Sequence, residues 1–253
     1  MNKRQKNKKF FIHNFFSKNR EGSHVGFVLS FIIFISFIIF IYPLLIKPAI
    51  ESNKDNQHLL NGLKTKLTEE ISAELTISSV EANTGANQNC IELGDFISNI
   101  GINSNIIIKN HVGVIQQGSV SGDSLRINRG DNNDVFFKVS YSEEFDVLND
   151  PIITCKKIQK NKYEIGLVRT EKYVFETKII NLIQRYESNY ESLKITLELP
   201  ERNEFDFSFI YNNKTSIGIK KEVSTSIYAK DIPVQYVNKK GDILLGNINI
   251  RIW

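Results

Sequence analysis

The feature that most constrains this chain is an uncharged apolar stretch from Val25 to Ile46. Its 22 residues read VGFVLSFIIFISFIIFIYPLLI, in which two serines and one tyrosine supply the polar side-chain groups. As an α-helix, a segment of this length extends over roughly 33 Å, enough to cross a hydrocarbon core of about 30 Å. A cleaved secretory signal is the rival interpretation, but its apolar region has only about 7 to 15 residues. We therefore expect a retained transmembrane helix over residues 25–46.

The charges on the two sides of this stretch are unequal. The first 24 residues carry seven Lys or Arg and one Glu, whereas residues 47–55 carry two Lys, one Glu and one Asp. Because basic flanks stay in the cytoplasm, residues 1–24 are predicted to be a cytoplasmic leader, with the rest of the chain beyond the lipid bilayer. The rest of the chain has 25 basic and 27 acidic residues, so it is not basic overall and we expect no nucleic-acid partner.

The chain has two cysteines, Cys90 and Cys155, and both fall in the part assigned to the outside. An even number in an oxidising compartment favours one disulfide, with two free buried thiols as the alternative. Closing a loop of about 65 residues would stabilise the fold by roughly 4 kcal/mol in the chain-entropy description. The tripeptide from Asn213 to Thr215 is an N-glycosylation sequon on the same side.

Residues 47–76 continue with helical periodicity and are predicted to form a helical extension. Apolar residues recur at intervals of three and four, at Leu60, Leu63, Leu67, Ile71 and Leu75. Pro43 and Pro48 remove backbone donors near the start of this extension. We expect a kink or break there that separates the membrane half from the soluble half.

Residues 77–253 are predicted to form an α+β head that is rich in strands. The strand predictions in its first half are Thr76–Glu81, Ile106–Lys109, Val112–Gln116, Ser124–Asn128, Val135–Tyr141 and Tyr163–Arg169. A second helix is predicted because one apolar stripe continues through Phe175, Ile179, Leu182, Tyr186, Tyr190, Leu193 and Leu197. Pro200 ends this helix.

From Phe205 onward the apolar period changes to two. Phe205, Phe207 and Phe209 alternate with polar residues, and a hairpin is predicted near the end, with its turn over residues 238–242. One apolar and one polar face are typical of an antiparallel sheet. We expect the amphipathic helix to pack on the apolar face of this sheet.

The sequence predicts a protein without catalytic activity. The four histidines do not form a zinc-protease pattern, and the sequence has neither a phosphate-binding loop nor a dinucleotide fingerprint. The serine of Gly118-Ser119-Val120-Ser121-Gly122 does not occupy the central position that a nucleophile elbow requires. We expect no catalytic residue, no metal site and no cofactor.

Arg20-Glu21-Gly22 lies just ahead of Ser23, after a basic leader and before one long apolar helix and a strand-rich head. In these features the chain resembles archaeal type IV pilin-like proteins, including single-span members with a class III signal peptide. The resemblance implies that a prepilin peptidase cuts after Gly22 on the cytoplasmic side. It also implies that the apolar helix packs beside those of other pilin-like subunits. An uncut membrane anchor is the other outcome that the sequence leaves open.

The function predicted from these features is structural: a cell-membrane protein with one span, a cytoplasmic N-terminus and an extracytoplasmic head, acting as a pilin-like or surface-adhesion component. The alternative is a monomeric bitopic envelope protein whose head binds a glycan, a peptide or a partner protein.

Overall fold

The computed structural model describes residues 22–83, 88–103, 105–129, 134–148 and 155–253, and only the backbone of residues 22–23 and 45–54. The chain divides into two units between Asp55 and Asn56. The basic leader, including Arg20, lies outside the described residues.

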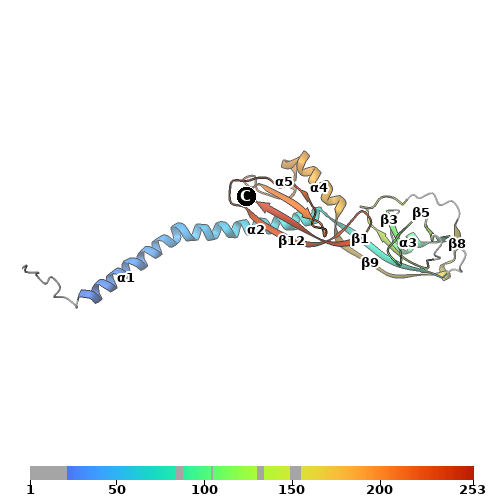
Figure 1. Ribbon diagram of the computed structural model, residues 1–253, viewed down its shortest axis with the longest axis horizontal. Helices are drawn as coiled ribbons and strands as arrows, with labels where there is room; N and C mark the ends of the chain where they lie inside the picture. Colours follow the sequence, from blue (N-terminus) through green and yellow to red (C-terminus); the bar gives the residue numbers. More distant parts are fainter. Residues whose placement is uncertain (1–21, 84–87, 104, 130–133, 149–154) are drawn as a thin grey trace, which may run out of the picture. The chain divides into compact units, whose positions relative to one another are not determined.

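The first described element is the apolar helix α1, Gly22–Ile41 (Figure 1). Instead of ending at Pro43, the backbone widens into a π-helical segment, Tyr42–Ile46 (η1), and continues as the α-helix α2, Lys47–Glu70. Proline lacks the N–H that an α-helix would use, and a π-helical turn is one of the ways in which a helix absorbs such a loss. The expected disturbance therefore takes the form of a local change in helix type.

The predicted helical extension is six residues too long. Helix α2 ends at Glu70, and strand β1, Ser72–Ala82, follows after one residue. Ile71 and Leu75 are buried, so their positions satisfied both the helical and the strand period. Residues 72–82 pair with two later strands of a sheet, and this long-range pairing decides the outcome.

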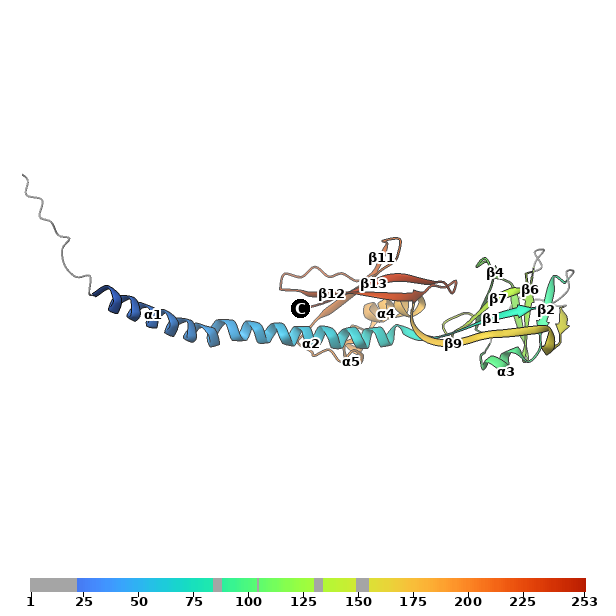
Figure 2. The ribbon, with the colours of Figure 1, turned by 90° about the horizontal axis from the view of Figure 1, so that it is seen from below.

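The larger sheet has nine strands in the order β11-β10-β13-β12-β9-β1-β7-β3-β4. Figures 1 and 2 show β9 following β1 along its length. Its remaining strands are β3 Ile106–Asn110, β4 Ile115–Gln116, β7 Phe136–Tyr141, β9 Tyr163–Phe175, β10 Phe205–Ile210, β11 Ser216–Gly218, β12 Tyr228–Val237 and β13 Ile243–Ile252. All neighbours pair antiparallel except β9 and β12, which are parallel.

A second, four-stranded sheet has the order β5-β6-β2-β8. It comprises β2 Cys90–Leu93, β5 Gly118–Ser121, β6 Ser124–Asn128 and β8 Lys156–Ile158, with the short helices α3 Phe96–Ile100 and η3 Lys160–Lys162 nearby in sequence. Here β2 and β8 are parallel. Both sheets are therefore mixed. The strands from Phe205 onward pair antiparallel with one another, as predicted, but the sheet that contains them also has one parallel pair, because its strands are partly joined by long crossovers.

The predicted second helix is interrupted. The structure has α4, Glu176–Ser188, and α5, Tyr190–Thr196, on either side of Asn189. The Asn189 side chain accepts a hydrogen bond from the backbone N–H of Ser192 at 3.3 Å, so it starts a new helix instead of continuing the old one. The periodicity did not reveal this interruption because Tyr186 and Leu193, on opposite sides of it, are both buried.

Two of the hydrophobic clusters account for most of the core of the second unit. One contains Leu60, Leu63 and Leu67 of α2, Ile179, Leu182 and Tyr186 of α4, and Phe205, Phe207, Ile248 and Ile250 of the sheet. The other joins both sheets through Val80, Ile91, Leu93, Phe96, Ile106, Leu125, Ile127 and Val139. The phenol of Tyr186 donates to the carbonyl of Phe205 at 2.6 Å, which satisfies a polar group inside the first cluster.

The predicted hairpin is confirmed as β12 and β13, which pair from Tyr228 to Ile252. Gly241 in its turn has φ +70°, a conformation that glycine adopts without penalty. Most other strand predictions lie within an observed strand, but the predicted strand Val112–Gln116 is reduced to Ile115–Gln116. Residues 111–113 form the turn that joins β3 to β4.

A substitution at Leu67 tests whether α2 packs in the hydrophobic core of the head. Leu67 has 0% exposure, so Leu67→Ala should lower the free energy of unfolding by about 2–5 kcal/mol because it leaves a cavity. Ile195 on α5 is 78% exposed, and Ile195→Ala should change it by less than about 0.5 kcal/mol. Denaturant unfolding of the full chain in detergent micelles provides the measurement. Equal losses for the two variants would contradict the assignment.

Candidate membrane helix and binding cleft

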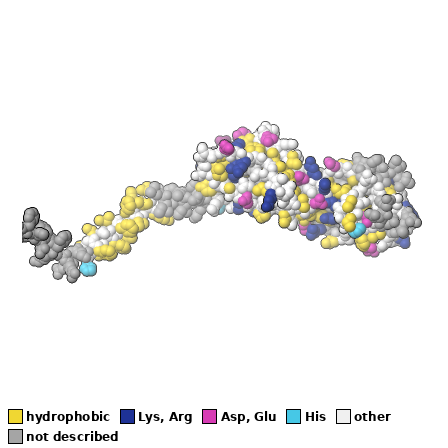
Figure 3. All heavy atoms as spheres, viewed as in Figure 1, with side chains coloured by type: hydrophobic (Ala, Val, Ile, Leu, Met, Phe, Trp, Pro, Cys, Tyr) yellow, Lys and Arg dark blue, Asp and Glu magenta, His cyan; other side chains and the backbone are white. Residues whose placement is uncertain are grey.

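Helix α1 carries an apolar surface that the structure leaves exposed. Residues His24–Leu44 form a 21-residue apolar helical segment, and none of its residues is buried. Figure 3 shows the apolar side chains that cover this helix; Phe27, for example, is 73% exposed. By length and composition the segment is able to cross a membrane.

The predicted peptidase site lies at the start of this helix. Gly22 and Ser23 are the first two residues of α1, described by their backbone, and Arg20 precedes the described residues.

A cleft of about 590 Å³ lies between the β12–β13 turn and the strands β1, β3 and β7. The residues that line it are Ser79, Lys109, Asn110, His111, Gly113, Phe136, Phe137, Lys138, Gly241, Asp242, Ile243 and Leu244. This volume falls in the range of small-molecule sites. The sequence analysis did not select these residues, since they come from four segments that only the tertiary fold brings together.

The floor of the cleft contains a row of three polar side chains. Ser79 on β1 and Lys109 on β3 are both the register partners of Lys138 on β7, and directly opposed residues share one face of a sheet. Lys109 is buried and forms an ion pair with Asp242. The Asn238 amide donates to the other oxygen of Asp242 at 3.1 Å, which holds this carboxylate at the hairpin turn.

The pKa values of Asp242 and Lys138, the two ionisable residues beside Lys109, are both lowered. The hydrogen bond from Lys109 holds the pKa of Asp242 below its usual value, with a further contribution from Asn238. The pKa of Lys138 is lowered, first by burial and then by repulsion from Lys109. Burial and Lys109 thus disfavour the positive charge on Lys138, while the Asp242 carboxylate partly offsets them.

His111 and Phe136 also line the cleft. His111 Nδ1 lies 3.1 Å from the buried carboxylate of Asp134, which also accepts a hydrogen bond from the Asn110 amide at 2.9 Å. Phe136 is 49% exposed, and it lies two residues from Lys138 on the same strand face. The arrangement offers a flat apolar surface beside cationic and hydrogen-bonding groups.

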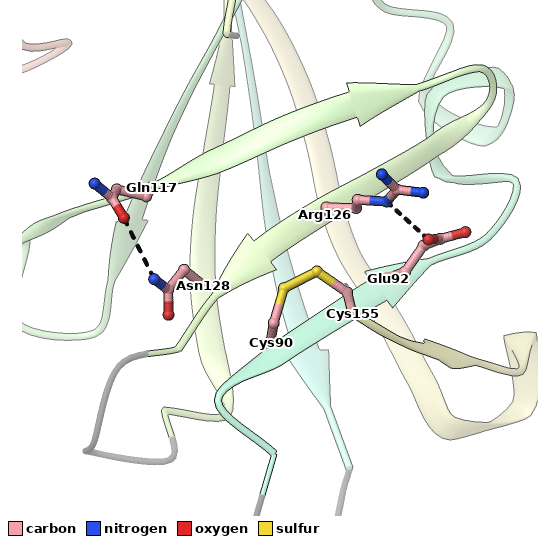
Figure 4. Close-up of a disulfide and its surroundings, with 6 residues drawn as sticks. All are labelled: Cys90, Glu92, Gln117, Arg126, Asn128 and Cys155. Atoms are coloured by element: carbon pink, nitrogen blue, oxygen red, sulfur yellow. Dashed lines mark hydrogen bonds and ion pairs between the residues drawn. A yellow bond between two sulfur atoms is a disulfide. The ribbon is translucent and has the colours of Figure 1, made fainter. Parts of the chain in front are cut away.

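Cys90 and Cys155 form a disulfide, the pairing expected from the sequence (Figure 4). It lies at the start of the parallel pair β2–β8, where Ile91 is opposite Lys156. The Arg126 guanidinium donates to the Glu92 carboxylate at 2.8 Å on the neighbouring strands. The disulfide therefore reinforces a three-residue strand, β8, that has little pairing of its own.

Asn213 lies exposed in the turn between β10 and β11. Its side-chain oxygen accepts hydrogen bonds from the Thr215 hydroxyl at 2.6 Å and the Thr215 backbone N–H at 3.0 Å. Glycosylation at this residue stays a prediction. Across the described ranges, no group of three or more His, Cys, Asp and Glu residues is placed to hold a metal ion.

No protein family matches the chain, and no solved structure matches it. It is similar to a probable serine/threonine-protein kinase of Dictyostelium discoideum, with 28% identity over 116 residues. The match includes 46% of this chain but spans 8% of the kinase's length. A likeness of this extent does not establish a family.

The Lys109–Asp242 pair predicts a specific acid response. Because the pKa of Asp242 is lowered in the folded state, its ionised carboxylate stabilises the fold fully above its ordinary pKa of 3.8. This contribution is lost as the pH falls through the lower folded-state pKa. The stability difference between wild type and Asp242→Asn should therefore shrink on acidification below about pH 4.

The same titration with Asp146→Asn provides the control, since Asp146 is exposed and does not line the cleft. Denaturant midpoints measured from neutral to acidic pH give the comparison. A wild-type to Asp242→Asn difference that stays constant with pH would show that the ion pair does not contribute in this way.

Proposed function

We propose that this chain is a non-catalytic, membrane-anchored, pilin-like structural or surface-adhesion protein of the cell envelope. The observation that carries the proposal is the 21-residue apolar segment His24–Leu44, none of which is buried. Exposed apolar surface on this scale is unfavourable in water and favourable in lipid or in a bundle of similar helices. The basic leader supports an N-terminus in the cytoplasm and a head outside.

In the proposed architecture, the apolar helix anchors an α+β head in which α4 packs on the larger sheet. The shared cluster of α4, α2 and sheet residues supports this packing. The disulfide supports an oxidising location for the head. In a filament, the uncharged helix would leave the bilayer and pack beside the helices of other pilin-like subunits.

The alternative is a monomeric bitopic protein whose head binds a glycan, a peptide or a partner protein. The cleft at Lys109 and Lys138 is the observation in favour of ligand binding. The two functions differ in whether the chain is processed and enters filaments.

Maturation of the N-terminus tests the pilin-like proposal. Co-expression with the cognate prepilin peptidase should give a product that begins at Ser23, measured by mass spectrometry of the intact protein. Expression without the peptidase should leave the residues before Ser23 in place. A product that begins at Met1 under both conditions and never enters filaments would remove the pilin-like proposal and favour the uncut anchor.

Membrane anchoring is tested separately by placing charge in the middle of α1. Each arginine at a helix centre opposes insertion by about 2.5–3.5 kcal/mol, so the double variant Ile33→Arg and Phe37→Arg should move the protein out of the membrane fraction. Replacing both residues with leucine should leave the distribution unchanged. The proposed anchor is wrong if the arginine variant remains in washed membranes as completely as the leucine variant.

A further inference from the structure

The residues that line the cleft carry more positive than negative charge. Lys109 and Lys138 are directly opposite on neighbouring strands, an arrangement that destabilises a sheet when the charges are alike. Asp242 forms an ion pair with Lys109. Two lysines thus face one carboxylate among the lining residues, with His111 as the remaining ionisable side chain.

The surroundings of Lys138 add to this imbalance. Repulsion from Arg169 on β9 lowers the pKa of Lys138 slightly, attraction to Asp242 raises it, and Arg169 itself pairs with Glu171 at 3.3 Å. Asp134 is the acidic group beside His111, and the amide of Asn110 contacts the same carboxylate. The charge that faces the cleft at Lys138 is therefore positive, and an anion is the ligand that would compensate it.

The apolar residues that line the cleft indicate which kind of anion would fit it. Phe136 is half exposed beside Lys138, and Leu244 lines the same cleft. A sugar ring has an apolar C–H face that fits an aromatic surface and hydroxyls that fit a polar group such as the Ser79 hydroxyl. One surplus positive charge is balanced by a single carboxylate, whereas a doubly charged phosphate would leave one negative charge uncompensated.

We propose that this cleft binds a carboxylate-bearing sugar unit of an acidic polysaccharide, with Lys138 contacting the carboxylate and Phe136 contacting the ring face. Lys109 positions Asp242 and keeps the hairpin turn against β3. The proposal goes beyond membrane anchoring and does not depend on it, because binding to the cleft is measured on protein held in detergent.

The test is calorimetric titration of the full chain, held in a detergent without a sugar headgroup. The probes are a short oligomer of glucuronate, a glucose oligomer of equal length, and a polyphosphate of similar total charge, all at one ionic strength. The glucuronate oligomer should bind saturably, and at least about tenfold more tightly than the glucose oligomer, because a charge-assisted hydrogen bond is lost in the neutral ligand.

Three lysine variants localise this binding. Lys138→Gln should weaken glucuronate binding at least about tenfold, whereas Lys138→Arg, which keeps the charge, should stay within about threefold of wild type. The matched control is Lys220→Gln, an exposed lysine that does not line the cleft, and it should change the affinity less than about twofold. Melting curves of all three variants verify that they remain folded.

Four outcomes would overturn the proposal. These are the absence of saturable glucuronate binding, equal affinity for the glucose oligomer, equal affinity for polyphosphate, and equal effects of Lys138→Gln and Lys220→Gln. Equal affinity for polyphosphate would mean that the head attracts polyanions through charge alone. Failure here leaves the maturation and membrane tests unaffected, so the two proposals are separable.

Discussion

The head depends on the antiparallel pairing of β1 with β9. Its register begins at Ser72 opposite Val174 and ends at Ala82 opposite Tyr163. Val174 belongs to the hydrophobic cluster that contains α2 and α4, whereas Ala82 and Tyr163 belong to the cluster that joins the two sheets. Among the described residues, this ladder therefore links the two clusters.

This ladder contains one irregularity that the sequence accommodates. The register shifts between Ser78 and Val80. Gly166 lies beside this bulge, and a Cβ on it would approach the Ser79 hydroxyl to 2.2 Å. A larger residue at position 166 would require the Ser79 hydroxyl to rotate away, whereas the Ser79 carbonyl oxygen, at 3.5 Å, would be in ordinary contact. Ser79 also lines the cleft, so the bulge helps to set the position of a side chain at its floor.

How much was predictable from the sequence depended on whether the decisive contacts were local. The hairpin β12–β13 and the strand β6 were found because alternating residues and turn residues lie in one short segment. The end of α2 was missed because Ile71 and Leu75 fit two periods, and the choice between them is made by β9, about a hundred residues later. Asn189 could have been recognised as a helix start, since Asn is a favoured N-cap.

The cleft was beyond sequence reasoning for a related reason. Lys109 and Lys138 are ordinary strand lysines until the register of β3 and β7 places them opposite each other, and Asp242 reaches Lys109 only through the fold of the last hairpin. By contrast, the cysteine pair could be predicted from count and compartment alone. The structure adds the location of the disulfide, which lies next to the short parallel pair of β2 and β8.

The disulfide has a mechanical consequence for a chain that is pulled by its two ends. Cys90 and Cys155 are 65 positions apart, and the bond between them makes the intervening segment a closed ring through which tension does not pass. Even with every hydrogen bond broken, that ring would withhold roughly 200 Å of contour length from extension. Under load, a head with this bond extends less than one without it. Strands β2 and β6, which both lie within the ring, can pair again quickly once the load is released, because the bond keeps them close together.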